Sequence, residues 1–231
     1  MIPIHNISKT STFEDYIEFS NNSIHDRIPR LSFSYLMTVS GQDFDCCNRI
    51  NDIDVEIHYP YDIPSIIHRM PQTLIGTIHL NLINLKAYID KGRLVSNAST
   101  KECHCDLFEE ILDYGTNQYR DLWKNILADQ ESKNILFLKS LFLQKDFRRF
   151  DVGRAIFNEL QHRFYGMFGL LATESIPMQF RENLPHGNGW DWDDMEKDSV
   201  RAGKMYREFL ERSGFTQHKD SSLYYSIGAT T

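Results

Sequence analysis

The sequence predicts an α/β or α+β protein with a mixed sheet flanked by helices. Runs of alternating apolar and polar residues, typical of half-buried strands, dominate the first half of the 231-residue chain. The second half alternates short apolar runs with amphipathic stretches, in the order strand, helix, strand, helix, strand. No Pro/Gly/Ser-rich linker divides the chain and its length is ample for one core, so we expect a single domain over residues 1–231.

The composition excludes several classes of protein. A content of 41% hydrophobic and 13% aromatic residues is too rich for a disordered chain. The net charge of −7 argues against a nucleic-acid binder, whose footprint is normally a basic face. The first residues lack the features of a signal peptide, and no apolar run is long enough to cross a bilayer. We therefore expect a soluble, cytoplasmic protein with no nucleic-acid or membrane partner.

Four cysteines occur in two clusters, Cys46-Cys47 and Cys103-His104-Cys105. A disulfide framework is not expected in an intracellular chain of this size. Zinc sites usually space their cysteines as CxxC, a geometry that neither cluster matches. Ordinary thiols are therefore the favoured interpretation and no metal site is predicted, with a structural metal at the second cluster as the alternative.

In the first half of the chain we expect a short helix followed by three strands. The helix is predicted over Thr12–Ser20, where polar and apolar positions are mixed. Leu31–Val39 is rich in aromatic and β-branched residues, and Asp52–Tyr59 alternates apolar and polar side chains, so both are predicted strands. Thr73–Ile83 alternates as well, with one polar face. Its apolar positions are Leu74, Ile78, Leu80 and Leu82, and its polar positions are Thr77, His79 and Asn81.

A helix and a central strand are expected next. Asp106–Ala128 carries apolar residues at helical spacing, with Gly115 as a point where the helix could divide. Asn134–Gln144 consists almost wholly of Ile, Leu and Phe, interrupted by Lys139 and Ser140. A strand that is buried on both faces has this composition.

The remaining elements continue the alternation of helices and strands. Apolar residues recur every four positions from Val152 to Phe164, which predicts an amphipathic helix that stops near Gly166. Proline and glycine residues between 177 and 189 predict a long loop. A strand, a helix and a final strand are expected at Gly169–Glu174, Asp198–Arg212 and Leu223–Ile227.

The turn between the central strand and the helix after it is basic. Four cations fall within ten residues of this otherwise acidic chain: Lys145, Arg148, Arg149 and Arg154. The free backbone N–H groups and the macrodipole of a helix start favour an anion, and Gly153 permits close backbone approach. The sequence therefore predicts a polyphosphate or pyrophosphate ligand. The alternative is that the four basic residues are simply solvated.

This stretch resembles the acyl-CoA-binding motif of the GCN5-related N-acetyltransferase (GNAT) superfamily. In that motif a hydrophobic strand runs through Arg/Gln-x-x-Gly-x-Gly/Ala into a helix. Arg148-Arg-Phe-Asp-Val-Gly153 occupies the six positions, with Asp151 in place of the first glycine. Gly169–Glu174 is similar to the family's next strand, which splays away from the first. Phe209–Phe215 is similar to its closing helix signature, with Leu210 where the family has a tyrosine.

The resemblance implies a GNAT-like, mostly antiparallel mixed sheet with splayed central strands, an N-terminal extension over residues 1–30 and an inserted helical segment at about 84–132. It also implies acetyl-CoA, or coenzyme A, as the cofactor. The acyl group would pass to an amine acceptor by direct attack in a ternary complex. The resemblance places the pantetheine arm against Leu141, Phe142 and Leu143, and the pyrophosphate against Arg148, Arg149, Phe150, Asp151, Val152, Gly153 and Arg154.

Amine acylation needs a base to remove a proton from the amine and an acid to protonate the leaving thiolate. Glu174, at the end of the second splayed strand, and His79, on a polar strand face, are the candidate bases. Tyr206 is the candidate acid, with Tyr224 and Tyr225 as further possibilities. The structural alternatives are a carboxylate that faces water, a polar-face histidine with a satisfied hydrogen bond, and a packing tyrosine.

The segment His186–Glu196 combines two tryptophans with a run of acidic residues. It predicts contacts to a cationic amine, through charge and through cation–π interaction. The alternative is a surface loop whose acidic end serves the start of the next helix.

The expected partner is a small-molecule or peptide amine, and a homodimer is left open. The competing function is a catalytically inactive binding or assembly module of the same fold, which Asp151 and Leu210 favour. A metal-stabilised interaction protein is a third alternative.

Overall fold

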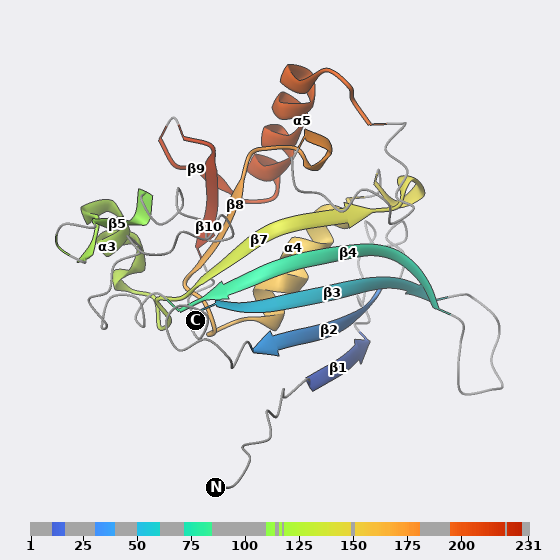
Figure 1. Cartoon of the computed structure of the whole chain (residues 1–231), viewed down its shortest axis with the longest axis horizontal. Helices are drawn as coiled ribbons and strands as arrows, with labels where there is room; N and C mark the ends of the chain where they lie inside the picture. Colours follow the sequence, from blue (N-terminus) through green and yellow to red (C-terminus); the bar gives the residue numbers. More distant parts are fainter. Residues whose placement is uncertain are drawn as a thin grey trace, which may run out of the picture.

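The computed structural model describes residues 11–16, 31–39, 50–60, 72–84, 110–113, 116, 118–148, 151–180, 195–219 and 221–227. An eight-stranded sheet in the order β1-β2-β3-β4-β7-β8-β10-β9 forms the centre of this part (Figure 1). Its neighbouring strands pair antiparallel except for β7 and β8, which pair parallel. The predicted α+β class with a mixed, mostly antiparallel sheet is therefore confirmed.

The first four strands form an antiparallel meander: β1 (Ser11–Tyr16), β2 (Ser32–Val39), β3 (Ile50–Pro60) and β4 (Gln72–Ile83). The strands predicted for β2, β3 and β4 are confirmed. The helix predicted over Thr12–Ser20 is wrong for residues 12–16, and residues 17–20 lie outside the described residues. Pairing with β2, in which Phe13 lies opposite Tyr35, overrides the weak local helix pattern.

A register shift in β4 changes which of its side chains are buried. Ile57 pairs with Gly76 but His58 pairs with Leu74, so Ile75 is an extra residue in β4. A bulge of this kind reverses the alternation of faces beyond it. As a result Ile75 is fully buried, whereas Leu74, an expected core position, is 37% exposed.

The alternating helices and strands of the second half are confirmed close to their predicted bounds. The Gly166 stop is also confirmed: its φ of 74° lies in the left-handed region that favours glycine. None of the helices among the described residues combines the length and the apolar character needed to cross a membrane. The elements are β7 (Ile135–Leu143), η4 (Lys145–Phe147), α4 (Val152–Arg163), β8 (Leu170–Glu174), η5 (Met178–Phe180), α5 (Ser199–Arg212), β9 (Thr216–Gln217) and β10 (Leu223–Ile227).

The helix expected over Asp106–Ala128, with Gly115 as a point where it could divide, is confirmed for residues 110–111 and 121–128 and wrong for the described residues between them. A small hairpin of β5 (Leu112–Asp113) and β6 (Gln118–Tyr119) lies there and precedes α3 (Asp121–Ala128). The hairpin satisfies backbone groups that the helix would have used. Residues 106–109 and Gly115 lie outside the described residues.

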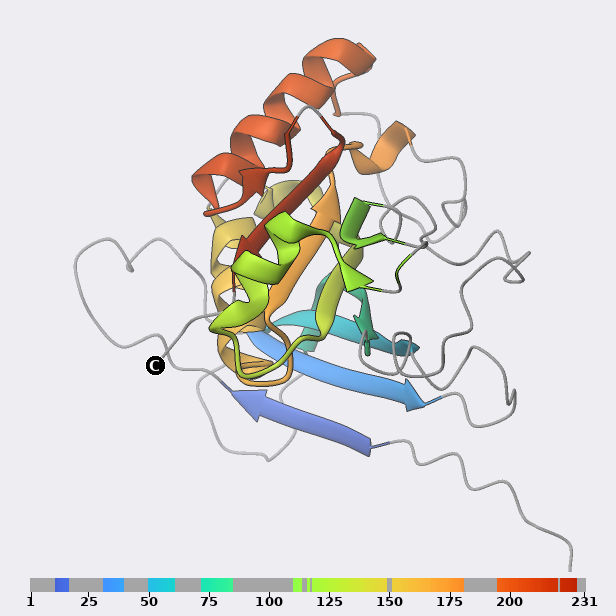
Figure 2. The same cartoon turned by 90° about the vertical axis from the view of Figure 1, so that its left-hand side faces the viewer.

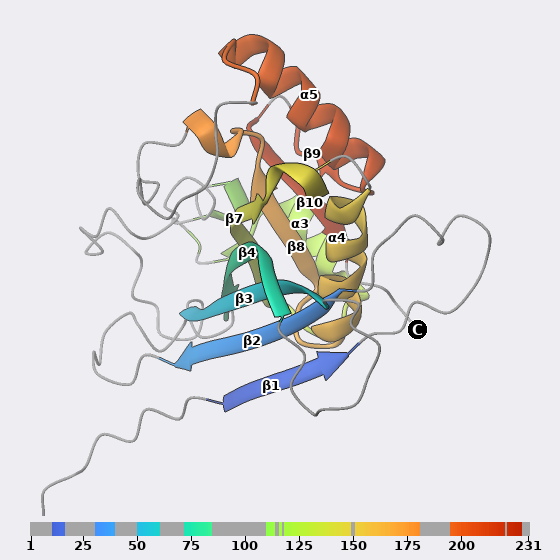
Figure 3. The same cartoon turned by 90° about the vertical axis from the view of Figure 1, so that its right-hand side faces the viewer.

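Helices cover both faces of the sheet. In Figure 2 the green α3 lies on the near side of β8 and β10, and Figure 3 shows α4 on the opposite side. The main core cluster lies on the α4 face and the second cluster lies on the α3 face. β7 contributes Leu136 and Leu138 to the main cluster and Ile135 and Phe137 to the second, which confirms a central strand buried on both faces.

The closing sequence Ser213-Gly-Phe ends α5 in a Schellman motif. The N–H of Phe215 donates to the carbonyl of Leu210, and the N–H of Gly214 donates to that of Glu211. Gly214 has a φ of 87°, which favours glycine. Leu210 and Phe215 are both buried, so this signature has a clear structural role.

Candidate functional site

The two central strands part half-way along β7. Ile135–Leu138 pairs with Leu170–Thr173 of β8, whereas β7 stays paired with β4 as far as Leu143. Figure 1 shows β8 turning away from β7 beyond this point. The ladder between β7 and β8 therefore ends at Leu138 and Thr173, five residues before the end of β7. A strand segment that leaves its ladder is a place where an extended ligand can form main-chain hydrogen bonds.

Two features mark the point where the strands part. His79 pairs with Ser140 but Leu80 pairs with Leu138, so Lys139 forms a bulge in β7. The buried Thr173 hydroxyl donates to the carbonyl oxygen of Leu138 at 3.2 Å. A bulge of this kind bends the strand that carries it, here β7. The Thr173 hydroxyl binds the carbonyl of Leu138, the last residue of β7 that pairs with β8.

Gln144 fixes the end of β7 to β4. Its backbone N–H donates to the carbonyl of Ile75, and its side-chain amide donates to the carbonyl of Leu74, both at 2.7 Å. The chain then turns through η4, whose Phe147 ring lies 5.6 Å from the Tyr59 ring. The end of β7 is thus held by β4, and the turn that follows it packs against β3.

The start of α4 has the features of an anion site. Asp151, which precedes the helix, has φ 54° and ψ 15°, and its side chain makes no capping hydrogen bond. This left-handed backbone is the reason a glycine suits the position, and Asp is among the few residues that tolerate it. The first N–H groups of α4 therefore receive no side-chain cap, and such groups bind anions well.

The predicted basic residues do not all face this helix start. The Arg154 guanidinium lies 3.7 Å from the Asp151 carboxylate, and both side chains are at least half exposed. Arg148 instead donates through Nε to the carbonyl of Leu143 at 2.8 Å, so it holds the end of β7. Lys145 is exposed, and Arg149 and Phe150 lie outside the described residues.

Gly153 has a packing role. A Cβ at this position would lie 2.7 Å from Cζ of Phe209, a ring on α5. The glycine thus permits close approach of α5 to the start of α4, whereas we expected it to admit a ligand. Val152, beside it, is buried in the main cluster.

The three candidate catalytic residues do not share one face of the sheet. Ile78 and Leu80 belong to the main cluster, so His79 between them points to the α3 face. Ala172, two residues before Glu174 on β8, belongs to the second cluster, so Glu174 also points to the α3 face. Tyr206 packs against the main cluster, on the α4 side.

β7 lies between the strands that carry His79 and Glu174. With about 4.8 Å between neighbouring strands, the Cα atoms of these two residues are at least about 10 Å apart. His79 is half-exposed and its Nδ1 contacts the Asp54 carboxylate on β3. Glu174, half-buried, ends β8 and directly follows the last residue of β8 that pairs with β7. Of these two residues, Glu174 is therefore the one next to the point where β7 and β8 part.

The tyrosines of β10 lie on opposite faces. Tyr224 is fully buried in the main cluster, and its hydroxyl donates to Glu211 at 3.4 Å. Burial raises the pKa of Tyr224, and the Glu211 carboxylate raises it further. Tyr225 packs edge-on against Trp123, with 5.1 Å between ring centroids. Tyr206 stacks on Phe209 at 6.2 Å.

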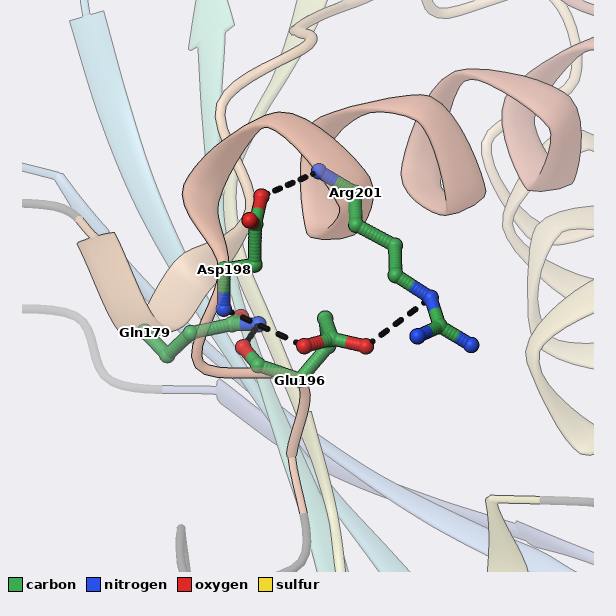
Figure 4. A network of polar contacts seen from close by, with 4 residues as sticks. All are labelled: Gln179, Glu196, Asp198 and Arg201. Atoms are coloured by element: carbon green, nitrogen blue, oxygen red, sulfur yellow. Dashed lines mark hydrogen bonds and ion pairs between the residues drawn. The ribbon is translucent and has the colours of Figure 1, made fainter.

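A polar network joins η5 to the start of α5 (Figure 4). Asp198 caps the helix, accepting from the N–H of Arg201 at 2.9 Å, and the Glu196 carboxylate contacts Arg201 at 3.1 Å. The Gln179 side chain donates to the Glu196 carbonyl at 3.3 Å. These acidic residues serve the helix start, which supports the structural alternative for this end of the loop. Residues 181–194, with both loop tryptophans, lie outside the described residues.

Four residues on the α3 face form a polar cluster that was not predicted. We call Glu110, Tyr119, Trp123 and His218 the Trp123 cluster. Burial lowers the pKa of His218 and raises that of Tyr119 to about 12. His218 directly follows a two-residue strand within a polar run, and no sequence spacing distinguishes it.

Both cysteine clusters lie outside the described residues. Within the described part, no group of three or more His, Cys, Asp or Glu side chains is arranged to hold a metal ion.

No protein-family model and no curated protein matches the sequence. The resemblance to the GNAT superfamily therefore rests on the motif residues of this chain.

Proposed function

We propose that the protein is an acyl-CoA-dependent N-acyltransferase of the GNAT type, which transfers an acetyl group from acetyl-CoA to an amine. The observation that carries the proposal is the parting of β7 from β8 beyond Leu138 and Thr173. The end of β7 beyond this point leads through a tight turn to an uncapped helix start. A strand edge beside a helix N-terminus suits a ligand with an amide-containing arm and a diphosphate.

The residues present suit such a cofactor. Leu141–Leu143, beyond the last pair of β7 with β8, would lie against the amides of the pantetheine arm. The carbonyl of Leu143 already accepts from Arg148, so it would not serve that arm. The pyrophosphate would bind the first N–H groups of α4, with Arg154 beside them.

The Asp151 carboxylate lowers the affinity of this site for an anion. Its carboxylate is the partner of Arg154 in the structure, and a bound diphosphate would replace it. The negative side chain therefore weakens binding without blocking it, because both side chains are exposed and their interaction is screened by solvent.

Bound acetyl-CoA would supply the thioester carbon that the amine nitrogen attacks, with loss of the C–S bond. Glu174 directly follows the last residue of β8 that pairs with β7, and its carboxylate would take the proton that the amine loses. Tyr206, on the α4 side, would give its proton to the leaving thiolate. The reacting atoms would lie between the two faces, which is consistent with a base and an acid on opposite sides.

Acetyl-CoA binding and thiol release test the proposal. Acetyl-CoA at a hundred times its Kd should stabilise the protein by about 2.7 kcal/mol, read as a rise in Tm. Thiol release should then follow on addition of a suitable amine. Arg154→Gln should reduce the rise in Tm, whereas the exposed Arg212→Gln on α5 should not. No rise in Tm and no heat of binding in calorimetry would contradict the proposal.

A catalytically inactive binding module of the same fold is the second candidate. Leu210, at the position of the family's tyrosine, is fully buried in the main cluster and cannot donate a proton. Acetyl-CoA binding without thiol release across a broad panel of amines, together with no effect of Tyr206→Phe, would favour this function.

A further inference from the structure

The Trp123 cluster is held together by contacts between separate elements of the α3 face. The indole N–H of Trp123 donates to the backbone carbonyl of Glu110 at 2.9 Å. The imidazole of His218 lies 4.8 Å from the Trp123 ring. His218 Nε2 is 3.8 Å from Glu110 Oε2, which is too long for a hydrogen bond. Tyr119 packs against the same apolar cluster as Trp123.

Among the residues that the structure describes, three buried polar atoms of this cluster have no hydrogen-bond partner. They are Glu110 Oε2, His218 Nδ1 and the hydroxyl of Tyr119. His218 is only 6% exposed, so bulk water does not replace the missing bonds. Buried polar groups in folded proteins are nearly always paired, so these atoms point to a partner that the described residues do not supply.

The chemistry of the cluster favours a cation as that partner. Desolvation lowers the pKa of His218, outweighing the Glu110 carboxylate that raises it, and Lys219 lowers it further. The imidazole is therefore neutral near pH 7 and offers a lone pair. Glu110 adds carboxylate oxygens, and Trp123 adds an aromatic ring. Among the described residues, no Lys or Arg forms an ion pair with Glu110. A primary ammonium group fits this set of acceptors.

The cluster lies on the same face of the sheet as Glu174. The N–H of His218 donates to the carbonyl of Leu223 at 2.8 Å, and Leu223 pairs with Glu174. Two strand spacings, about 10 Å, therefore separate the backbones of His218 and Glu174. An aliphatic chain of several methylene groups can span that separation.

We propose that the Trp123 cluster binds a second ammonium group of the acyl acceptor, and that the acceptor is therefore an aliphatic di- or polyamine. This inference rests on the proposed function, with Glu174 at the reacting amine. The ammonium in the cluster stays charged, while the other amino group loses its proton and attacks the thioester.

A titration of the full-length chain with butane-1,4-diamine tests the binding step without acetyl-CoA. The indole N–H resonance of Trp123, assigned by comparison with Trp190→Phe and Trp192→Phe, should shift with the diamine and not with butan-1-ol. Glu110→Gln should weaken binding at least about tenfold. The exposed Glu131→Gln is the matched control and should bind as the wild type does. His218→Asn is a second variant in case Glu110→Gln does not fold, with folding read from Tm.

The outcomes separate this inference from the proposed function. If acyl transfer occurs, Glu110→Gln should raise KM for heptane-1,7-diamine, whose chain is long enough for both sites, at least about tenfold and leave KM for heptylamine unchanged. Equal effects on the two amines, an unmoved Trp123 resonance, or an equal response to butan-1-ol would overturn the inference, with ordered water as the occupant. If no acetyl-CoA binds but the diamine still shifts Trp123, the proposed function fails and the ammonium site stands.

Discussion

The two faces of the sheet each bury a polar cluster, and the clusters differ in one respect. On the α4 face, the buried Glu159 accepts from the Tyr35 hydroxyl at 2.9 Å and from Arg163 Nε at 3.4 Å. The Arg163 guanidinium also lies 5.3 Å from the centroid of the Tyr35 ring. In this network Glu159 has partners on two sides. On the α3 face, no described residue is a hydrogen-bond partner of Glu110 Oε2 or His218 Nδ1.

Because of this difference, we interpret the Glu159 network as structural and the Trp123 cluster as a candidate site. The Glu159 network joins α4 to β2, so its hydrogen bonds contribute to stability. The Trp123 cluster contributes less to the free energy of unfolding than its burial suggests, because unpaired polar groups cost free energy in the folded state. Such a cost is typical of sites that a ligand completes.

The largest effect should come from breaking the satisfied network. Glu159→Ala removes the carboxylate that accepts from the Tyr35 hydroxyl and from Arg163, so it should destabilise the protein by about 3–5 kcal/mol. Chemical denaturation measures this loss. Glu131→Ala, at an exposed position, should change the free energy of unfolding by less than about 0.5 kcal/mol. A loss of stability in Glu159→Ala as small as that in Glu131→Ala would contradict a stabilising role for the Glu159 network.

A pair of hydroxyl deletions sharpens the comparison. Tyr35→Phe removes a hydrogen bond to a carboxylate and should cost about 1.5–3 kcal/mol. Tyr119→Phe removes a buried hydroxyl that has no partner, so the free energy of unfolding should stay the same or rise. Both variants are compared by urea denaturation at one pH. Equal losses in the two variants would mean that the Tyr119 hydroxyl is paired in solution.

The pH dependence of stability should reveal the neutral His218. Its folded pKa lies below the ordinary value of 6.5, so the unfolded chain binds the proton first as the pH falls. The stability associated with the neutral imidazole is therefore complete above about pH 6.5 and declines below it, down to the folded pKa. Denaturation at pH 7.5 and 5.5 should show a smaller loss for His218→Asn than for the wild type. The same loss in both would contradict the burial of a neutral imidazole.

The smallest expected effect concerns the backbone at the candidate cofactor site. Asp151→Gly places glycine in a left-handed conformation, which should offset most of the added unfolded-state entropy and change stability by at most about 1 kcal/mol. Removing the carboxylate beside Arg154 should also tighten acetyl-CoA binding. Calorimetry compares the two proteins, and weaker binding by Asp151→Gly would mean that Asp151 assists the cofactor.

Strands and helices with strong periodicity were predictable from the sequence. β7, α4, α5 and β10 each bury a regular set of apolar residues, so pattern and structure agree. β1 and the β5–β6 hairpin were not predictable, because their conformation depends on pairing with another strand. The bulge at Ile75 in β4 could not be predicted for the same reason, because a bulge exists only relative to the partner strand.

The candidate site was predictable in its position along the chain and less so in its contacts. The basic turn does lead into a helix start, but Arg148 binds the end of β7 and Gly153 accommodates Phe209. Neither contact follows from spacing, because each joins segments that only the fold brings together. His218 was missed for the same reason: its environment comes from Glu110 and Trp123, about a hundred residues away.

The most direct test of the central claim is a backbone amide NMR titration with acetyl-CoA. The amides of Leu141–Leu143 and of Val152–Arg154 should shift together, with the same affinity, because one ligand contacts both the strand edge and the helix start. Saturation without shifts at these two segments, or no saturable shift at all, would contradict it.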